Sequence, residues 1–217
     1  MKKSIEVGLA LLAACSLAGA AQAQTVFSET FDAGVASFTG DPYWLDNASV
    51  NGFVTMTTNT PLIQGGAFTD SITTDASGAG YFLFNGTAGE IPSGQDQFYV
   101  SSSFAVEPNT DYILSFKLTN ANLHSAAQIV PELGGTTLGT FAAIGEFATD
   151  GWQSFTVGWN SGAATSASLI LHDLETATLG NDFGLDEISI VASPEPASAA
   201  LFAAGIAGMG LLRRRRR

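Results

Sequence analysis

The residues that could support hydrolysis are two histidines, His124 and His172, and a large set of carboxylates. The sequence contains no Gly-x-Ser-x-Gly motif, so neither histidine stands beside a serine nucleophile of that kind. His172 is followed by Asp173, and successive residues of a strand point to opposite faces. We interpret the two as surface residues at the end of a strand. A glycosidase would need two acids set apart from the others, and no pair stands out. A small glycan-active hydrolase is therefore only an alternative to a non-enzymatic role.

Carboxylates could also bind a metal ion. Glu29 lies between Phe27 and Phe31 at alternating positions, and Asp186 shares the alternation of the two isoleucines that follow it. If the apolar residues face the core, so do the carboxylates, which is costly without a compensating cation. Hard oxygen ligands suit Ca²⁺. The pattern predicts either acids at strand ends in water or a structural calcium site with the ligands Glu29 and Asp186, to which Asp32 and Asp182 could be added.

Aromatic side chains form the third set, because exposed rings on a rigid scaffold can stack on sugars. Tyr43 and Trp44 follow an Asp-Pro pair in a loop-like segment and are the first candidates for glycan binding. Tyr81 and Tyr99 are weaker candidates, and a core position is predicted for Trp152 and Trp159. The alternative is that all of these rings belong to the core.

Charge limits the classes of partner. The 217 residues carry a formal charge of −12, but most basic residues lie at the two ends. The stretch from Gln24 to Ser193 contains 18 of the 20 acidic residues but only one basic residue, Lys117, so its formal charge is −17. Such a body lacks the Lys and Arg that neutralise a phosphate backbone, which excludes nucleic-acid binding. It also disfavours contact of the body with an anionic membrane surface.

The elements that must position these side chains are short strands. Tyr112, Leu114, Phe116 and Leu118 share one parity, which is the period-two pattern of a strand with one buried face. No segment of the middle region has a convincing helical pattern. One all-β domain over residues 24–192, a sandwich or jelly roll, is predicted. The expected strands include Thr25–Phe31, Phe53–Thr57, Tyr81–Phe84, Phe98–Phe104, Tyr112–Leu118, Phe141–Phe147, Trp152–Trp159, Ala167–Leu171 and Leu185–Val191.

The N-terminal residues 1–23 read as a secretory signal peptide. Two lysines precede an apolar run from Val7 to about Ala20, and a small-x-small pattern ends at Ala23. Signal peptidase would then cut between Ala23 and Gln24. A competing interpretation treats Leu12-Ala13-Ala14-Cys15 as a lipobox with a lipidated Cys15. Cleavage after Ala23 leaves no cysteine, which excludes a thiol nucleophile and thiolate metal ligands.

The C-terminal residues 193–217 combine three features. Pro194, Glu195 and Pro196 precede an apolar stretch over residues 197–212. Those 16 residues would span about 24 Å as a helix, a short match to a hydrocarbon core of about 30 Å. Positive charges stay on the cytoplasmic side and would hold the body outside the inner membrane. The membrane-stop cluster consists of Arg213, Arg214, Arg215, Arg216 and Arg217.

This order of motif, apolar helix and terminal arginines resembles the PEP-CTERM sorting domain of Gram-negative bacteria. The resemblance covers about Ser193–Arg217. It implies recognition by an exosortase, a membrane-embedded cysteine protease-transpeptidase, and cleavage near Pro194-Glu195-Pro196. It also implies release or transfer of the body to the cell surface, often in organisms that form exopolysaccharide or biofilm. The alternative is an ordinary C-terminal anchor.

The body, about Thr25–Val191, resembles the galactose-binding-like jelly rolls related to carbohydrate-binding modules. The resemblance rests on Tyr112–Phe116, Trp152–Trp159, and a final strand that follows Gly180-Asn181-Asp182-Phe183. It implies one structural calcium where the first and last strands pair. Many functions share this fold, so sugar binding does not follow from it.

Together these patterns predict a secreted or cell-surface protein that is not an enzyme and is processed by signal peptidase and exosortase. We expect adhesion or association with exopolysaccharide in an extracellular matrix. The runner-up is a purely structural surface component, which is acidic and thereby soluble. The two differ in whether the body binds a polysaccharide.

Overall fold

The structure, a computed structural model, describes residues 23–31, 45–46, 53–57, 81–85, 96–120, 126–145, 151–175 and 181–193. The body, Thr25–Ala192, is one compact unit. The other unit joins Met1–Gln24 and Ser193–Arg217, and only residues 23, 24 and 193 of it are described. None of the described residues forms a helix long and apolar enough to cross a membrane. The expected membrane helix itself, residues 197–212, lies outside them.

Strands make up the regular structure of the described body, as predicted. In chain order they are β1 (Thr25–Glu29), β2 (Leu45–Asp46), β3 (Phe53–Thr57), β4 (Tyr81–Asn85), β5 (Gln97–Val100), β6 (Phe104–Ala105), β7 (Asp111–Asn120), β8 (Ile129–Leu133), β9 (Thr136–Thr137), β10 (Gln153–Asn160), β11 (Ser166–Ala167), β12 (Leu169–Asp173) and β13 (Phe183–Ala192).

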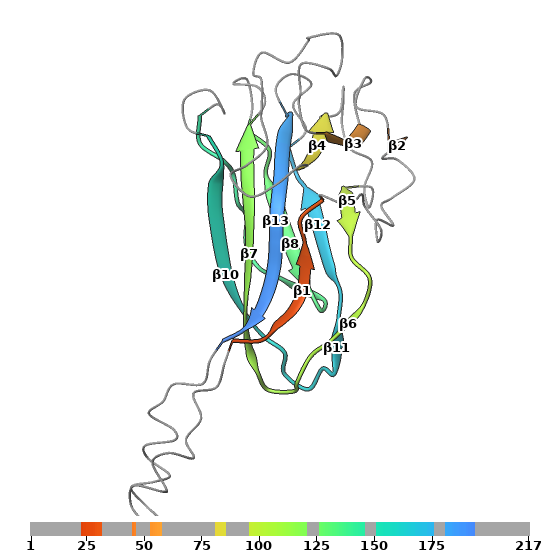
Figure 1. The fold of residues 1–217 in the computed structure, drawn as a ribbon, viewed down its shortest axis with the longest axis vertical. Helices are drawn as coiled ribbons and strands as arrows, with labels where there is room; N and C mark the ends of the chain where they lie inside the picture. Colours follow the sequence, from red (N-terminus) through yellow and green to blue (C-terminus); the bar gives the residue numbers. More distant parts are fainter. Residues whose placement is uncertain are drawn as a thin grey trace, which may run out of the picture. The chain divides into compact units, whose positions relative to one another are not determined.

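The larger sheet has the order β10-β7-β13-β4-β3-β2. Its last strand in sequence, β13, lies inside the sheet (Figure 1). β13 pairs with β7 on one side, and on the other it pairs first with β4 and then with β1. All pairs in this sheet are antiparallel except β2 with β3. The first and last strands of the body therefore lie side by side.

The smaller sheet has the order β5-β12-β8-β9, and β6 pairs with β11 in a separate ribbon. Apolar side chains of both sheets meet in one core, in which Leu114, Phe116, Leu171, Leu185 and Ile190 are 0–1% exposed. The result is an all-β sandwich of antiparallel sheets, consistent with the predicted jelly roll. Burial of apolar surface at roughly 25 cal/mol per Å² stabilises this packing.

Alternation explains why β7 and β10 form as the sequence predicts. Along β7, Tyr112, Leu114, Phe116 and Leu118 are buried, while Ile113 between them is 42% exposed. β10 pairs with β7 from Gln153 to Asn160 without a shift in register. The two strands therefore share one core face and one outer face.

Two segments differ from the prediction. Phe141–Phe147 was expected to be a strand, but Phe141 makes only an isolated bridge to Ile129 and the described residues after it are not in a strand. There the Asn120 Nδ2 donates to the carbonyls of Ala143 and Gly145, which fixes an irregular backbone.

The strand β8 is not among the strands named from the sequence, and it has Pro131 in its middle, although proline disfavours a central strand. The Pro131 carbonyl accepts from Leu138 N at 2.9 Å, so the proline nitrogen also faces the β9 side. The ladder to β12 therefore loses no donor, and β8 pairs with β12 from Ile129 to Leu133.

Candidate functional site

His172 lies on the outer face of the smaller sheet, in the middle of three strands. In β12, the burial pattern alternates, so that Leu171 and Asp173 are buried whereas Ile170 and His172 are partly exposed. The register places His172 opposite Gln97 of β5 and Val130 of β8. Residues of two neighbouring strands can therefore reach the imidazole from both sides.

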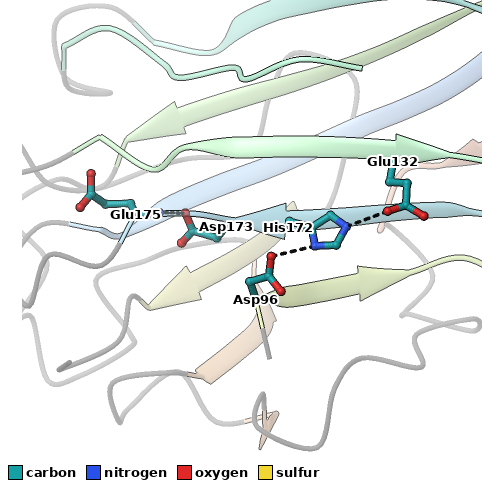
Figure 2. Close-up of polar contacts among 5 residues, drawn as sticks. All are labelled: Asp96, Glu132, His172, Asp173 and Glu175. Carbon is teal, nitrogen blue, oxygen red and sulfur yellow. Dashed lines mark hydrogen bonds and ion pairs between the residues drawn. The ribbon is translucent and has the colours of Figure 1, made fainter. Parts of the chain in front are cut away.

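Two carboxylates flank this imidazole (Figure 2). The Nδ1 of His172 lies 3.0 Å from Asp96 Oδ2, and its Nε2 lies 3.6 Å from Glu132 Oε2. The side chains of His172, Asp96 and Glu132 are 14%, 27% and 31% exposed. We call these three residues the His172 cluster. Because β-strands carry the histidine and Glu132, and Asp96 adjoins β5, the cluster is held in place before any ligand arrives.

The His172 cluster can exchange hydrogen bonds in both directions. An imidazole both donates and accepts when neutral, and a carboxylate accepts through two oxygens. One oxygen of each carboxylate faces the imidazole, Oδ2 of Asp96 and Oε2 of Glu132. Such a set of donors and acceptors suits hydroxyl groups of a ligand laid across β5, β12 and β8.

A second polar network lies directly behind the cluster, inside the protein. Asp173 is 0% exposed. Its Oδ1 accepts from the backbone N–H of Gln128 at 3.2 Å and of Glu175 at 3.0 Å, and its Oδ2 accepts from Asn181 Nδ2 at 2.8 Å. The prediction that His172 and Asp173 point to opposite faces is confirmed. The interpretation of Asp173 as a surface residue is wrong, because its side chain is fully buried.

Burial raises the pKa of Asp173 to about 7, and it does so against the three hydrogen bonds, which favour the carboxylate. A general acid of a glycosidase also needs a raised pKa, but it must touch the glycosidic oxygen. Asp173 cannot, since no part of it reaches the surface. Its unusual titration therefore belongs to the stability of the body and gives no support to hydrolysis.

Glu29, a predicted calcium ligand, lies on the core side of β1. It is in register with Ile188 of β13, a core residue, and it is partly buried. Its Oε1 accepts from the N–H of Phe31 at 2.9 Å, and Phe31 has a φ of 55°. The carboxylate thus stabilises a left-handed turn at the end of β1.

Asp186, the second predicted ligand, is 1% exposed but does not follow the alternation of the isoleucines after it. The register of β13 against β7 shifts between Asp186 and Ser189, which indicates a β-bulge there. Asp186 is consequently opposite Lys117, whereas Ile188 and Ile190 face the core. At the bulge, Glu187 has a φ of 48° and its carboxylate pairs with Lys117 Nζ at 2.7 Å.

The other two calcium candidates, Asp182 and Asp32, give little further information about a site. Asp182 is partly buried, and Asp32 lies outside the described residues. In the ranges that the structure describes, no three His, Cys, Asp or Glu side chains are grouped as metal ligands would be. The calcium site remains a prediction for Glu29 and Asp186, on strands that do pair.

The aromatic candidates separate into two groups. Tyr99 and Trp159 are buried in the core at 0% and 6% exposure, which confirms the prediction for Trp159 and removes Tyr99 as a glycan-binding residue. Trp152 was predicted to be in the core but is half-buried outside the core cluster. It lies against Gly184, where a Cβ atom would come within 2.8 Å of its Cη2. Tyr43 and Trp44 lie outside the described residues, as does the side chain of Tyr81.

The sorting residues also lie outside the described part of the chain. This holds for Pro194, Glu195 and Pro196 and for the arginines at positions 213–217. At the other end, Ala23 and Gln24 are exposed directly before β1 begins. Signal cleavage at this junction remains a prediction.

Sequence reasoning did not find Asp96 or Glu132. The hydrogen bond from His172 to Asp96 joins residues 76 positions apart. Only the pairing of β12 with β5 and β8 brings these groups together. The sequence offered only a histidine at the surface end of a strand, and this does not identify the residues that lie beside it on the neighbouring strands.

Comparisons with known proteins show the fold alone. No family model and no curated protein matches the chain. A cyclase from Fischerella sp. TAU matches with a TM-score of 0.50 and 14% identity, over 81% of this chain and 100% of that one. The xylan-binding CBM22-1 domain of Paenibacillus barcinonensis Xyn10C matches with a TM-score of 0.46 and 14% identity, over 82% and 100%. A CBM6 module of Cellvibrio mixtus lichenase 5A, in complex with cellotriose, matches with a TM-score of 0.43 and 12% identity, over 77% and 97%.

Proposed function

We propose that this chain is a non-enzymatic protein of the cell exterior that associates with polysaccharide through the outer face of β5, β12 and β8. The observation that carries the proposal is the His172 cluster, in which Asp96 and Glu132 hold an imidazole from both sides at 3.0 and 3.6 Å. Binding sites use a few well-placed polar groups on a rigid scaffold to orient a ligand. Here two carboxylates converge on one imidazole across neighbouring strands.

Charge defines the kind of polysaccharide. The cluster contributes two carboxylates, and the stretch from Gln24 to Ser193 carries −17. Like charges disfavour each other across an interface. The ligand is therefore a neutral or amine-bearing glycan rather than a polymer rich in uronic acids.

The test is affinity electrophoresis and glycan-array binding of the chain expressed from its full coding sequence. His172→Gln and Asp96→Asn remove the contact between the imidazole and the carboxylate but keep the side chains close to their original size. Loss of hydrogen bonds to charged groups, at about 1.5–3 kcal/mol each, weakens binding on the order of tenfold or more. The matched control is Ser28→Ala, an exposed residue of β1 in the other sheet, which leaves binding unchanged.

Two results would overturn the proposal. One is that the purified body retains no polysaccharide at all, including that of the organism that produces it. That outcome would favour the alternative of a structural surface component, which the charge of −17 supports because acidity maintains solubility. The other is that the two substitutions leave an existing affinity unchanged, which would move glycan binding to another surface, such as the predicted Tyr43 and Trp44.

The route to the surface is part of the proposal. Signal peptidase removes residues 1–23, and the arginines at 213–217 retain the precursor at the inner membrane. An exosortase then cleaves near Pro194-Glu195-Pro196. This route is supported by the order of the sequence motifs and their position at the two ends of the chain.

A further inference from the structure

The strand β10 ends the larger sheet on one side. It pairs with β7 along all of its residues, and no other described strand pairs with its second edge. In Figure 1 it is the outermost arrow of that sheet, drawn in teal. An edge of this kind presents a row of backbone N–H and C=O groups that can pair with another strand.

One hydrogen bond shows which residues of β10 direct their backbone N–H and C=O groups away from β7. Just beyond β10, Ser161 N donates to Thr110 O at 3.0 Å, in continuation of the β10–β7 register. Hydrogen-bonded pairs alternate along an antiparallel ladder, so the odd-numbered residues of β10 bond to β7. The even-numbered residues direct their N–H and C=O groups away from β7; they are Ser154, Thr156, Gly158 and Asn160.

Proteins normally protect such edges by charges, prolines, bulges or short strands. β10 has eight residues, Gln153–Asn160, with neither a charged residue nor a proline. Its register with β7 shows no bulge. A long, regular and uncharged edge is unexpected in a body with a charge of −17, unless it is a contact surface.

The core face of β10 is also incompletely covered. Phe155 and Val157 are only partly buried, whereas Leu114 and Phe116, their partners in β7, are 0% and 1% exposed. A further strand beside β10 would remove apolar surface of Phe155 and Val157 from water, which is favourable. The edge thus offers both backbone pairing and apolar burial.

We propose that β10 pairs in an antiparallel manner with β10 of a second copy of this chain, around a two-fold axis near Val157. Such an axis places the apolar residues of both strands on one face and their hydroxyl groups on the other. A second copy fits because β10 has no charged side chain, so two acidic bodies can meet there without opposed carboxylates in the paired strands. The carboxylate of Asp111, opposite the last residue of β10, already accepts from Asn160 Nδ2.

This inference is independent of the proposed glycan site, and it has a functional consequence. Two joined bodies would carry two His172 clusters on one rigid assembly. Linked sites bind a repeating polymer more tightly than either site alone. The dimer would therefore convert a weak glycan contact into durable attachment.

Sedimentation velocity of the chain expressed from its full coding sequence tests the dimer. We expect a concentration-dependent dimer, and Thr156→Lys should weaken it on the order of tenfold by placing like charges beside the axis. The matched control is Ser28→Lys, an exposed residue of β1 away from this edge, which should leave the dimer unchanged. A monomer at all concentrations, or equal effects of both substitutions, would overturn the proposal.

Cross-linking tests the geometry separately. In a Cys15→Ser background, Thr156→Cys places two thiols near the axis as diagonal neighbours, about 7–8 Å apart. A short thiol-specific linker should then join two chains, and it should not do so for Ser28→Cys. Equal cross-linking of both variants would show that the association does not use β10.

Discussion

Asn181 and Asp173 are joined inside the sandwich by a hydrogen bond of 2.8 Å, from Asn181 Nδ2 to Asp173 Oδ2. The bond ties the end of β12 to the segment that enters β13, and the same Nδ2 also donates to the Glu175 carbonyl at 2.9 Å. Both Asn181 and Asp173 are almost fully buried. A buried carboxyl group thus links the two sheets at this end.

The first prediction concerns pH. Asp173 has a pKa of about 7 in the folded protein, against about 3.9 in an unfolded chain. The folded state therefore binds the proton more tightly, and its contribution to stability is complete below about pH 4. The contribution is lost as the pH rises through 7, so the free energy of unfolding should fall by roughly 3 kcal/mol between pH 5 and pH 8 from this group. Urea titrations at the two pH values measure the change.

Asp173→Asn serves as the reference for that experiment, because an amide does not titrate. The stability of this variant relative to the wild type should increase with pH over the same window. If the two proteins keep a constant difference in free energy of unfolding from pH 5 to pH 8, Asp173 does not titrate as stated.

The second prediction concerns two neighbouring glycines. Gly134 has a φ of 56°, and a Cβ there would lie 2.8 Å from Trp159 Cζ2, in the core. Gly135 has a φ of 80°, but a Cβ there would meet nothing within 4 Å. Both alanine variants carry the cost of a left-handed backbone, about 1–2 kcal/mol. Gly134→Ala should lose about 1–3 kcal/mol more by overpacking against Trp159. Equal melting temperatures for the two variants would contradict this contact.

The third prediction concerns calcium. If Glu29 and Asp186 bind Ca²⁺, millimolar calcium should raise the melting temperature relative to EDTA, because a ligand at 100 times its Kd stabilises by about 2.7 kcal/mol. Glu29→Gln should abolish that difference. Glu187→Gln is the control, since Glu187 pairs with Lys117. Identical melting curves of the wild type in calcium and in EDTA would remove the site.

The fourth prediction concerns the tail. Substitution of Pro194 and Glu195 by alanine should leave the tail attached, so that the protein accumulates in the inner membrane. Ser193→Ala, one position earlier, should be processed normally. Intact-mass measurement decides the matter, because a secreted wild-type protein that still ends at Arg217 would rule out this processing.

The sequence predicted the fold best where a strand exposes one face to water. β7 shows this, since Leu114 and Phe116 are buried whereas Ile113 is exposed and Ser115 and Lys117 are partly exposed. The sequence analysis did not name β8, whose ladder to β12 tolerates Pro131 because the proline nitrogen faces the other neighbour. Prediction failed at Phe141, where side-chain hydrogen bonds from Asn120 replace strand pairing.

Only part of the candidate site could be predicted from the sequence. His172 could be placed on the outer parity of a strand, but Asp96 and Glu132 come near it only through the registers of β5 and β8 with β12. The alternation that was expected to place Asp186 beside the isoleucines does not continue through the bulge in β13. Local patterns cannot specify contacts that depend on long-range pairing or on a one-residue insertion.

For the export route that we propose, the position of β13 has a consequence for the order of events. This strand ends at Ala192 and supplies the partners of β7, β4 and β1, so the larger sheet cannot close until almost the whole body has been synthesised. Pairings between distant segments form late, because loop closure must precede them. The body would thus pass through the translocation channel as an open chain and complete its sheet when Ala192 emerges, immediately before the sorting motif. Folding and exposure of that motif would become successive steps of one process.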